Sequence, residues 1–251
     1  MKRIRENYYE SGRAAAEYLI LHYGKPEPLL PPEVAACGAP RFVERCVTEC
    51  LDARRLSPDA RALDLGCAVG RASFELARHC AEVVGVDTSR QFIRIARHLR
   101  AIGSLSFRYI EEGERTGRHR AAVPRGIDRS RVKFVAGDAA RPPAGLGTFD
   151  VVLMANLIDR MAAPETCLRR LPALVKPGGQ LILTSPYTWL REYTPRKHWL
   201  GGGRGRTFAA IRTILAPHFK LARRLDLPFV IREHARKFQL GVAEAGVWLR
   251  R

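Results

Sequence analysis

The sequence predicts an α/β protein built around a parallel sheet, and three observations support this class. Apolar strand-like segments alternate with helix-like segments from residue 61 onward, which is the βαβ pattern of a parallel sheet. The length of 251 residues fits one such domain with additional segments. Hydrophobic residues make up 46% and charged residues 27%, which is close to globular averages and excludes disordered and fibrous classes.

Two helices are expected before the alternation begins. Helical spacing covers residues 7–23, and a proline-rich connector covers residues 26–32. A second helix is expected over residues 42–56, with Ser57-Pro58 ending it. These segments form a predicted N-terminal helical cap over residues 1–59.

The main domain is expected over residues 60–251. Its predicted elements are the strand RALDLG, a helix over 71–79, the strand EVVGVD, a helix over 89–101, the strands VKFVAGD and FDVVLMAN, a helix over 164–174, the strand QLILTSP, a helix over 207–216, a strand over 219–227, the loop PFVIREHARKFQ and a strand over 241–249. Two insertions are expected, at about 103–131 and 187–205. The first is too polar and irregular to form core.

The net charge of +18 comes mainly from arginine, with 36 arginines against seven lysines. A basic surface can attract nucleic acid or anionic membranes. However, the chain has no run of five basic residues and no interleaved aromatic RNA-binding pattern. We therefore attribute the charge to an arginine-rich background and expect no nucleic-acid partner.

The six cysteines point to a reducing compartment. They include no C-x-x-C pair and no histidine at zinc spacing, so we expect no metal. No signal peptide is evident, and no apolar run approaches the roughly 18 residues of a membrane span. We expect a soluble cytoplasmic protein without a membrane partner.

The segment LDLGCAVGR at residues 63–71 carries the first chemical signal. It is a strand followed by a tight loop with Gly66 and Gly70, and the loop opens a helix. Glycine permits positive φ and close approach of a ligand to the backbone. A tight turn that binds nothing is the alternative.

Asp87 ends the next strand, 23 residues after Asp64, where a carboxylate can accept both hydroxyls of a ribose. A nicotinamide-binding protein would share these features, but it would need a second domain. The loop also has Ala68 where the dinucleotide-binding motif has its middle glycine.

Together, LDLGCAVG, GVD, GDA, FDVVLMAN and KPGGQLILT resemble the class I S-adenosylmethionine-dependent methyltransferases over most of residues 60–250. The resemblance implies a Rossmann-like seven-stranded sheet with helices on both faces, and S-adenosylmethionine as cofactor. It places Gly66, Cys67 and Gly70 at the methionine part, Asp87 at the ribose, Asp138 with Ala139 at the adenine, and Asn156 beside the sulfonium. We add Asp64 and Thr88 to the expected cofactor-binding residues.

Segments outside this core carry a narrower resemblance. NYYES, YLILHYG, NLIDRM, SPYTW and DLPFVIREHARKFQLGVAEAGVW resemble the mercaptohistidine N-methyltransferases of ovothiol biosynthesis. The resemblance implies 5-thiohistidine as acceptor and methylation of the ring nitrogen nearest the side chain. It also implies functional pairing with an iron-dependent sulfoxide synthase. These 251 residues contain no such synthase domain, so we expect methylation alone.

Acceptor-binding residues are expected at the carboxyl ends of the strands, where open α/β sheets bind ligands. Asn156 and Asp159 are the expected catalytic residues, and Asp159 is the preferred polar contact of the acceptor. Its alternative role is to compensate a helix dipole. The expected substrate-binding residues are Tyr8, Tyr9, Asp159, Arg160, Tyr187, Trp189, Tyr193 and Arg232.

Several of these residues have structural alternatives. Tyr8 and Tyr9 resemble aromatics that fold over the cofactor, or they pack the first helix. Trp189 and Tyr193, with Trp199, form a lid over the acceptor or only pack the second insertion. Arg232 binds a substrate carboxylate or belongs to the solvated surface.

Three other functions stay open. The protein could methylate RNA, although the [N/D]-P-P-[Y/F] motif is missing and SPYTW is a poor substitute. It could methylate another small molecule. It could also be a non-catalytic partner subunit with a methyltransferase fold, although the loop and Asp87 argue against this.

Overall fold

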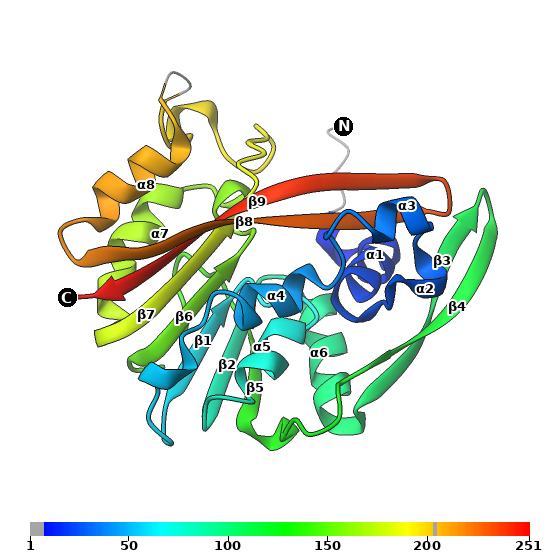
Figure 1. Cartoon of the computed structure of the whole chain (residues 1–251), viewed down its shortest axis with the longest axis horizontal. Helices are drawn as coiled ribbons and strands as arrows, with labels where there is room; N and C mark the ends of the chain where they lie inside the picture. The colour runs from blue at the N-terminus through cyan, green and yellow to red at the C-terminus, as the bar shows by residue number, and fades with distance from the viewer. Residues whose placement is uncertain (1–7, 203–204) are drawn as a thin grey trace, which may run out of the picture.

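A seven-stranded, mostly parallel sheet forms the centre of the protein (Figure 1). The computed structural model describes residues 8–202 and 205–251. The strand order is β5-β2-β1-β6-β7-β9-β8, and only the pairs β7–β9 and β9–β8 are antiparallel. The prediction of a seven-stranded Rossmann-like sheet is therefore confirmed.

The strands of this sheet are β1 (Arg61–Leu65), β2 (Glu82–Asp87), β5 (Val132–Ala136), β6 (Phe149–Ala155), β7 (Val175–Ser185), β8 (Phe219–His234) and β9 (Lys237–Arg250). Alternate residues of the central strands face opposite sides. In β6, Val151 and Leu153 belong to one hydrophobic cluster, and Val152 and Met154 belong to the other. Because both faces are buried, helices have to cover both.

Helices cover each face, as predicted. One face carries α4 (Phe42–Thr48), α5 (Arg71–Leu76) and α6 (Arg90–Ile102), and the other carries α7 (Pro164–Arg170) and α8 (Thr207–Leu215). Phe74 of α5 and Phe92 of α6 fill the first cluster, whereas Leu168 of α7 and Ile211 of α8 fill the second.

The N-terminal residues form a 3-10 turn η1 (Tyr8–Glu10) and helices α1 (Gly12–Tyr23), α2 (Pro26–Leu29) and α3 (Pro32–Ala35). The expected single helix from residue 7 is therefore shorter. It begins after Ser11, whose hydroxyl accepts a hydrogen bond from Ala14 N at 3.1 Å. Asn7 lies outside the described residues. Figure 1 shows α1 to α3 beside the outer part of the β8–β9 hairpin.

The second helix also ends earlier than predicted, at Thr48 instead of residue 56. Gln180 explains the early end, because its side chain pairs with the backbone of Asp52 through bonds of 2.9 and 3.0 Å. A short 3-10 turn, η2 (Ala53–Arg55), follows.

The first insertion is regular and not irregular as expected. It forms an antiparallel hairpin of β3 (Ser104–Glu112) and β4 (Arg115–Ala122), a separate two-stranded sheet. Most of its side chains are exposed or half-buried, which agrees with its polar composition. The turns η3 (Arg129–Arg131), η4 (Ile158–Arg160), η5 (Leu171–Ala173) and η6 (Arg196–His198) connect other elements.

The prediction of a loop over residues 228–239, PFVIREHARKFQ, is wrong. Strands β8 and β9 continue through it and pair from Phe219 with Arg250 to His234 with Lys237. The outer part of this hairpin packs against α1. Its mixture of polar and apolar residues is therefore that of a strand pair with one face on a helix, and not that of a solvated loop.

We expect Phe74→Ala to destabilise the protein strongly. Phe74 is fully buried and packs edge-on against Phe134 at 5.5 Å, so truncation removes buried area and leaves a cavity. The expected loss is about 3–5 kcal/mol of unfolding free energy, measured by urea denaturation. Ile102→Ala, at a side chain that is 65% exposed, serves as control and should change stability by less than about 1 kcal/mol. Equal losses in the two variants would contradict the packing described here.

Candidate functional site

The loop after β1 adopts a conformation that suits glycine at two positions. Gly66 and Gly70 have φ of 76° and 87°. A Cβ on Gly70 would meet the Phe134 ring at 2.5 Å, and one on Gly66 would meet a Leu157 methyl at 2.9 Å. The loop is held to β2, because Gly66 N donates to Val86 O at 2.8 Å. The backbone of this loop therefore lines the cavity next to β1 and can contact a bound ligand closely.

Ala68 replaces the middle glycine of the dinucleotide motif and still adopts a left-handed φ of 44°. This conformation directs its N–H to Asp87 Oδ2 at 2.9 Å. Asp87 Oδ1 accepts a second bond from Ser89 N at 2.8 Å. Burial raises the pKa of Asp87, and the bonds from backbone N–H groups oppose this rise. The carboxylate is thus fixed in orientation at the end of β2.

Asp64 lies inside β1 and is 1% exposed. Ser73 Oγ of α5 donates to its Oδ2 at 2.6 Å. Burial raises the pKa of Asp64 to about 7. The bond joins the strand before the loop to the helix after it.

Asn156 follows β6 and has a left-handed φ of 49°, which asparagine tolerates better than most residues. Thr184 Oγ1 donates to its Oδ1 at 3.0 Å, and Asn156 N donates to Thr184 O at 2.9 Å. The side chain is therefore held by β7 at the edge of the site.

Asp159 and Arg160 follow in the turn η4. Asp159 is fully buried, and its Oδ2 pairs with Arg160 Nη1 at 2.9 Å. Among the described residues, Asp159 Oδ1 has no hydrogen-bond partner. Burial raises the pKa of Asp159, and the Arg160 charge opposes this rise. Arg160 is also held by Thr188 O at 2.7 Å and lies over the Tyr193 ring at 5.4 Å.

Aromatic rings from distant parts of the chain enclose this region. Tyr9 lies 5.7 Å from Tyr193, 6.0 Å from Tyr18 and 6.1 Å from Phe92 between ring centroids. Tyr18 and Phe92 lie 4.8 Å apart. Tyr8 and Tyr9 of η1 and Tyr18 of α1 thus form one wall of the site, which we call the N-terminal wall.

A cavity of about 440 Å³ lies between these groups, a size that suits a small-molecule ligand. The predicted residues that line it are Tyr8, Tyr9, Asp64, Gly66, Cys67, Asp87, Thr88, Asn156, Asp159, Arg160 and Tyr193. We call it the main cavity. It brings the expected cofactor and acceptor groups into one space.

Two predicted adenine residues and one loop glycine do not line this cavity. Asp138 caps its own turn, accepting a bond from Ala140 N at 2.8 Å. Ala139 packs in the core next to α7. Gly70 faces Phe134 and Ala96.

Three predicted acceptor residues also lie elsewhere. Tyr187 and Trp189 pack against the α7 and α8 side of the sheet, and Trp189 Nε1 donates to Thr207 Oγ1 at 3.1 Å. Trp199 stacks on Trp189 at 6.3 Å. Arg232 is 3% exposed and donates to Leu29 O and Ile110 O at 3.1 and 2.9 Å, so the structure does not bring it to the main cavity.

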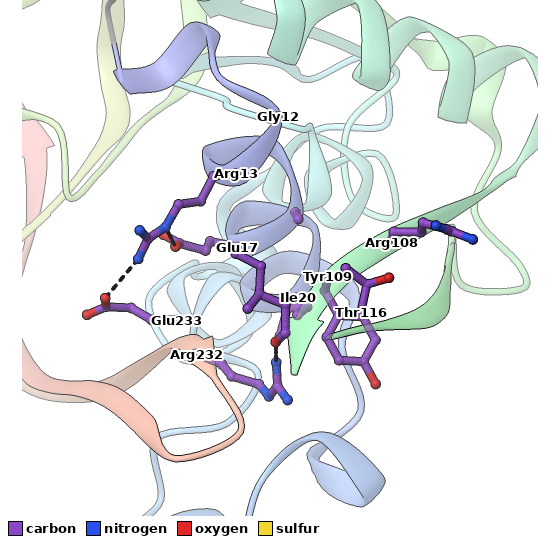
Figure 2. A pocket seen from close by; sticks show the side chains of 11 residues that line it. Gly12, Arg13, Glu17, Ile20, Arg108, Tyr109, Thr116, Arg232 and Glu233 are labelled. Carbon is purple, nitrogen blue, oxygen red and sulfur yellow. Dashed lines mark hydrogen bonds and ion pairs between the residues drawn. The ribbon is translucent and has the colours of Figure 1, made fainter. Parts of the chain in front are cut away.

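A network of charged groups supports the N-terminal wall (Figure 2). Glu17 accepts bonds from the Tyr8 hydroxyl and from Arg13 Nε, the latter at 2.8 Å. Arg13 Nη2 pairs with Glu233 Oε2 of β8 at 3.0 Å. Glu17 also lines a second cavity of about 200 Å³ on the other side of α1, which Arg232 borders. The network therefore connects Tyr8 to the β8–β9 hairpin.

The turn η1 is held above α6 in a similar way. The Glu10 carboxylate accepts bonds from Arg90 N at 2.8 Å and Gln91 N at 3.2 Å, in the first turn of that helix. Ser89 Oγ donates to Tyr9 O at 2.8 Å. The N-terminal wall thus lies next to Asp87, two residues before Ser89.

Sequence reasoning missed several lining residues, among them Glu17, Tyr18, His22 and Phe92. The signal that could have found two of them is the i, i+4 spacing of Tyr18 and His22, which places both on one face of α1. Among the described residues, no group of three histidine, cysteine or acidic side chains could hold a metal. No described helix combines the length and apolar character needed to span a membrane.

Comparison with known proteins relates this region to methyltransferases. Residues 63–183, which include the glycine loop, Asp87, Asn156 and Asp159, match the family described as Methyltransferase domain. The match covers 121 of the 251 residues, just under half of the chain. The sheet and helices have the Rossmann-like fold of methyltransferases.

The curated relatives that match this chain are distant. The ubiquinone biosynthesis O-methyltransferase of Xanthomonas campestris pv. campestris is 29% identical over 133 residues, 53% of this chain and 46% of that protein. The match thus spans about half the length of the relative.

Solved structures share its fold. The N-methyltransferase NodS from Bradyrhizobium japonicum WM9, in complex with S-adenosyl-L-homocysteine, has a TM-score of 0.52 at 14% identity and covers 94% of this chain and 98% of its own. The [4+2]-cyclase SpnF has a TM-score of 0.51 at 18% identity, with 83% and 79% coverage. Because these two proteins are named for different reactions, the fold alone does not define the reaction.

We expect Asp64 to make the stability of the ligand-free protein depend on pH. Its pKa is about 7 in the folded protein against 3.8 ordinarily. Between pH 4 and 7 the folded state therefore binds more protons than the unfolded state, so unfolding free energy falls as pH rises. Relative to Asp64→Asn, the wild type should lose about 2–4 kcal/mol over this range and then level off.

Urea denaturation at several pH values measures this difference. Asp226→Asn, at an exposed position in β8, is the matched control and should leave the pH profile of the wild type unchanged. Parallel profiles of wild type and Asp64→Asn would show that Asp64 is ionised throughout.

Proposed function

We propose that this protein is an S-adenosylmethionine-dependent methyltransferase that methylates a ring nitrogen of 5-thiohistidine, the nitrogen nearest the side chain. The observation that carries the proposal is the main cavity, where Asp87 and the glycine loop meet Asp159, Arg160 and an aromatic wall. The sequence resemblance to mercaptohistidine N-methyltransferases supports the choice of acceptor.

The residues present fit the methyl donor. The Asp87 carboxylate is oriented by two backbone N–H groups and lines the cavity, so it can accept bonds from both hydroxyls of a ribose. Gly66 lines the cavity, and its missing side chain leaves room for Leu157, which lines the same cavity. When bound, the donor supplies a methyl group already activated on a sulfonium.

The protein then has to position the acceptor and exclude water. Tyr9, Tyr18 and Tyr193 present ring faces and edges that suit a flat heteroaromatic acceptor. Tyr8, Tyr9 and Tyr18 cover one side of this space. An acceptor nitrogen must face the methyl carbon in line with the sulfur, so the fixed geometry of the rings selects the atom that reacts.

In this proposal, Asp159 binds the acceptor substrate and takes up the proton that its ring releases. Its Oδ1 is buried without a partner among the described residues, while Arg160 occupies Oδ2. The raised pKa brings the carboxyl closer to the range in which it can take a proton from the ring. Asn156, held by Thr184, lines the cavity beside it.

A hydroxyl acceptor is the second candidate. It is favoured by the name of the Xanthomonas relative, an O-methyltransferase, over residues that include the cofactor loop. A phenolic ring would use the same aromatic wall. The two candidates differ in the atom methylated.

An acceptor assay separates the candidates. The protein is incubated with S-adenosylmethionine and, separately, 5-thiohistidine, histidine, a simple thiol and a catechol, and mass spectrometry follows methylated product and S-adenosylhomocysteine. We expect 5-thiohistidine to gain one methyl group, which NMR assigns to the ring nitrogen nearest the side chain. Turnover of catechol alone would support the hydroxyl acceptor instead. No product with any acceptor, and no heat on titration with S-adenosylhomocysteine, would reject a methyltransferase.

We expect Asp159→Asn to lower kcat/KM for the acceptor by about 10²–10⁴-fold, the usual contribution of a positioned acid or base. The wild-type rate should rise with pH as Asp159 loses its proton, and the variant should lack this step. Asp226→Asn is the matched control and should retain the wild-type profile. An unchanged profile in Asp159→Asn would assign Asp159 a purely structural role.

A further inference from the structure

The side chain of His22 is a half-buried polar group that the proposed reaction has not used. It projects from α1 and lines the main cavity, one helical turn after Tyr18. Its Nδ1 is buried and has no hydrogen-bond partner among the described residues. A buried polar nitrogen without a partner is unfavourable, so a partner supplied by a ligand would explain its position.

His22 lies at the glycine-loop side of the cavity. The next residue, Tyr23, donates through its hydroxyl to Val69 O in the loop at 2.9 Å. The ring centroids of His22 and Tyr23 are 6.3 Å apart. The loop follows β1, which lies between β2 with Asp87 and β6 with Asn156. The bond from Tyr23 attaches the end of α1 to the loop, so His22 lines the cavity next to the loop that follows β1.

The surroundings of His22 keep its imidazole neutral. Burial lowers the pKa of His22 to about 3, and the positive charge of Arg71 lowers it further, so the ring is neutral at neutral pH. Arg71 is itself held in place by Glu44 and Glu75 at 2.9 and 2.6 Å. A neutral imidazole can donate one N–H to a ligand group, and an anionic group is a strong acceptor of such a bond.

The geometry points to His22 as a residue that binds the α-carboxylate of the methyl donor, by donating from Nδ1. This inference rests on the proposed function. The donor is elongated, with its sulfur between the ribose and the amino-acid end. If Asp87 holds the ribose and the methyl group faces Asn156 and Asp159, the amino-acid end extends along the β1 loop toward His22.

Two ligands that differ only in this end test the inference. S-adenosylhomocysteine carries the amino-acid end, whereas 5′-deoxy-5′-methylthioadenosine keeps the nucleoside and thioether without it. Titration calorimetry compares the full-length wild type with His22→Phe, which keeps an aromatic ring but removes the donor, and with His22→Asn, whose amide nitrogen can replace Nδ1. His98→Phe, at an exposed position of α6, is the matched control.

We expect His22→Phe to weaken S-adenosylhomocysteine binding about 10–100-fold, as for loss of a hydrogen bond to a charged group. Binding of methylthioadenosine should stay within about threefold of wild type. His22→Asn should recover most of the affinity for S-adenosylhomocysteine, and His98→Phe should match the wild type.

Other outcomes overturn the inference. Equal weakening of both ligands in His22→Phe would mean that His22 only maintains the fold of the cavity wall. Unchanged affinity for both ligands with a raised KM for the acceptor would place His22 in the acceptor site. Failure of the wild type to bind S-adenosylhomocysteine would instead reject the proposed function, so the two failures are distinguishable.

Discussion

The hydrogen bond from Ala68 N to Asp87 Oδ2 is the interaction on which the site depends. It forms only because Ala68 adopts a left-handed φ between two glycines that do the same. The bond connects the ends of two neighbouring strands, β1 and β2, and directs one carboxylate and one loop toward the same space. The other groups of the main cavity are arranged around this pair. Without the bond, Asp87 would be buried with less compensation for its charge.

The site also depends on contacts between residues that lie far apart in the sequence. The parallel sheet supplies one side of the main cavity, but Tyr8, Tyr9 and Tyr18 come from residues that precede the sheet. They are held there by Glu10 of η1, which accepts a bond from Arg90 N of α6, and by the network of Glu17, Arg13 and Glu233. The two ends of the chain therefore cooperate in building one site, because Glu233 belongs to the strand next to the last. The fold explains how the glycine loop after β1 meets side chains from α1 and from the β8–β9 hairpin in one cavity.

The central strands, and the meeting of the glycine loop and Asp87 in one cavity, could be predicted because their signals are local. A buried strand, a glycine loop and an acidic residue at the next strand end are adjacent in sequence. The extension of β8 and β9 could not be predicted, because the residues from Pro228 to Gln239 are mixed in polarity and become strand only through pairing and contact with α1. Arg232 shows the same limit: its partners Leu29 and Ile110 are more than 100 residues away. His22 was missed because a histidine in an apolar helix carries no chemical signal until its neighbours are known.

The attachment of η1 to α6 has a further structural consequence. Glu10 accepts bonds from two N–H groups in the first helical turn, where the helix dipole favours a carboxylate, so the turn is fastened directly beside Asp87. Ser89 N, at the start of the same helix, donates to Asp87 Oδ1. A change in the position of this helix start would therefore move a wall of the main cavity and the Asp87 carboxylate together.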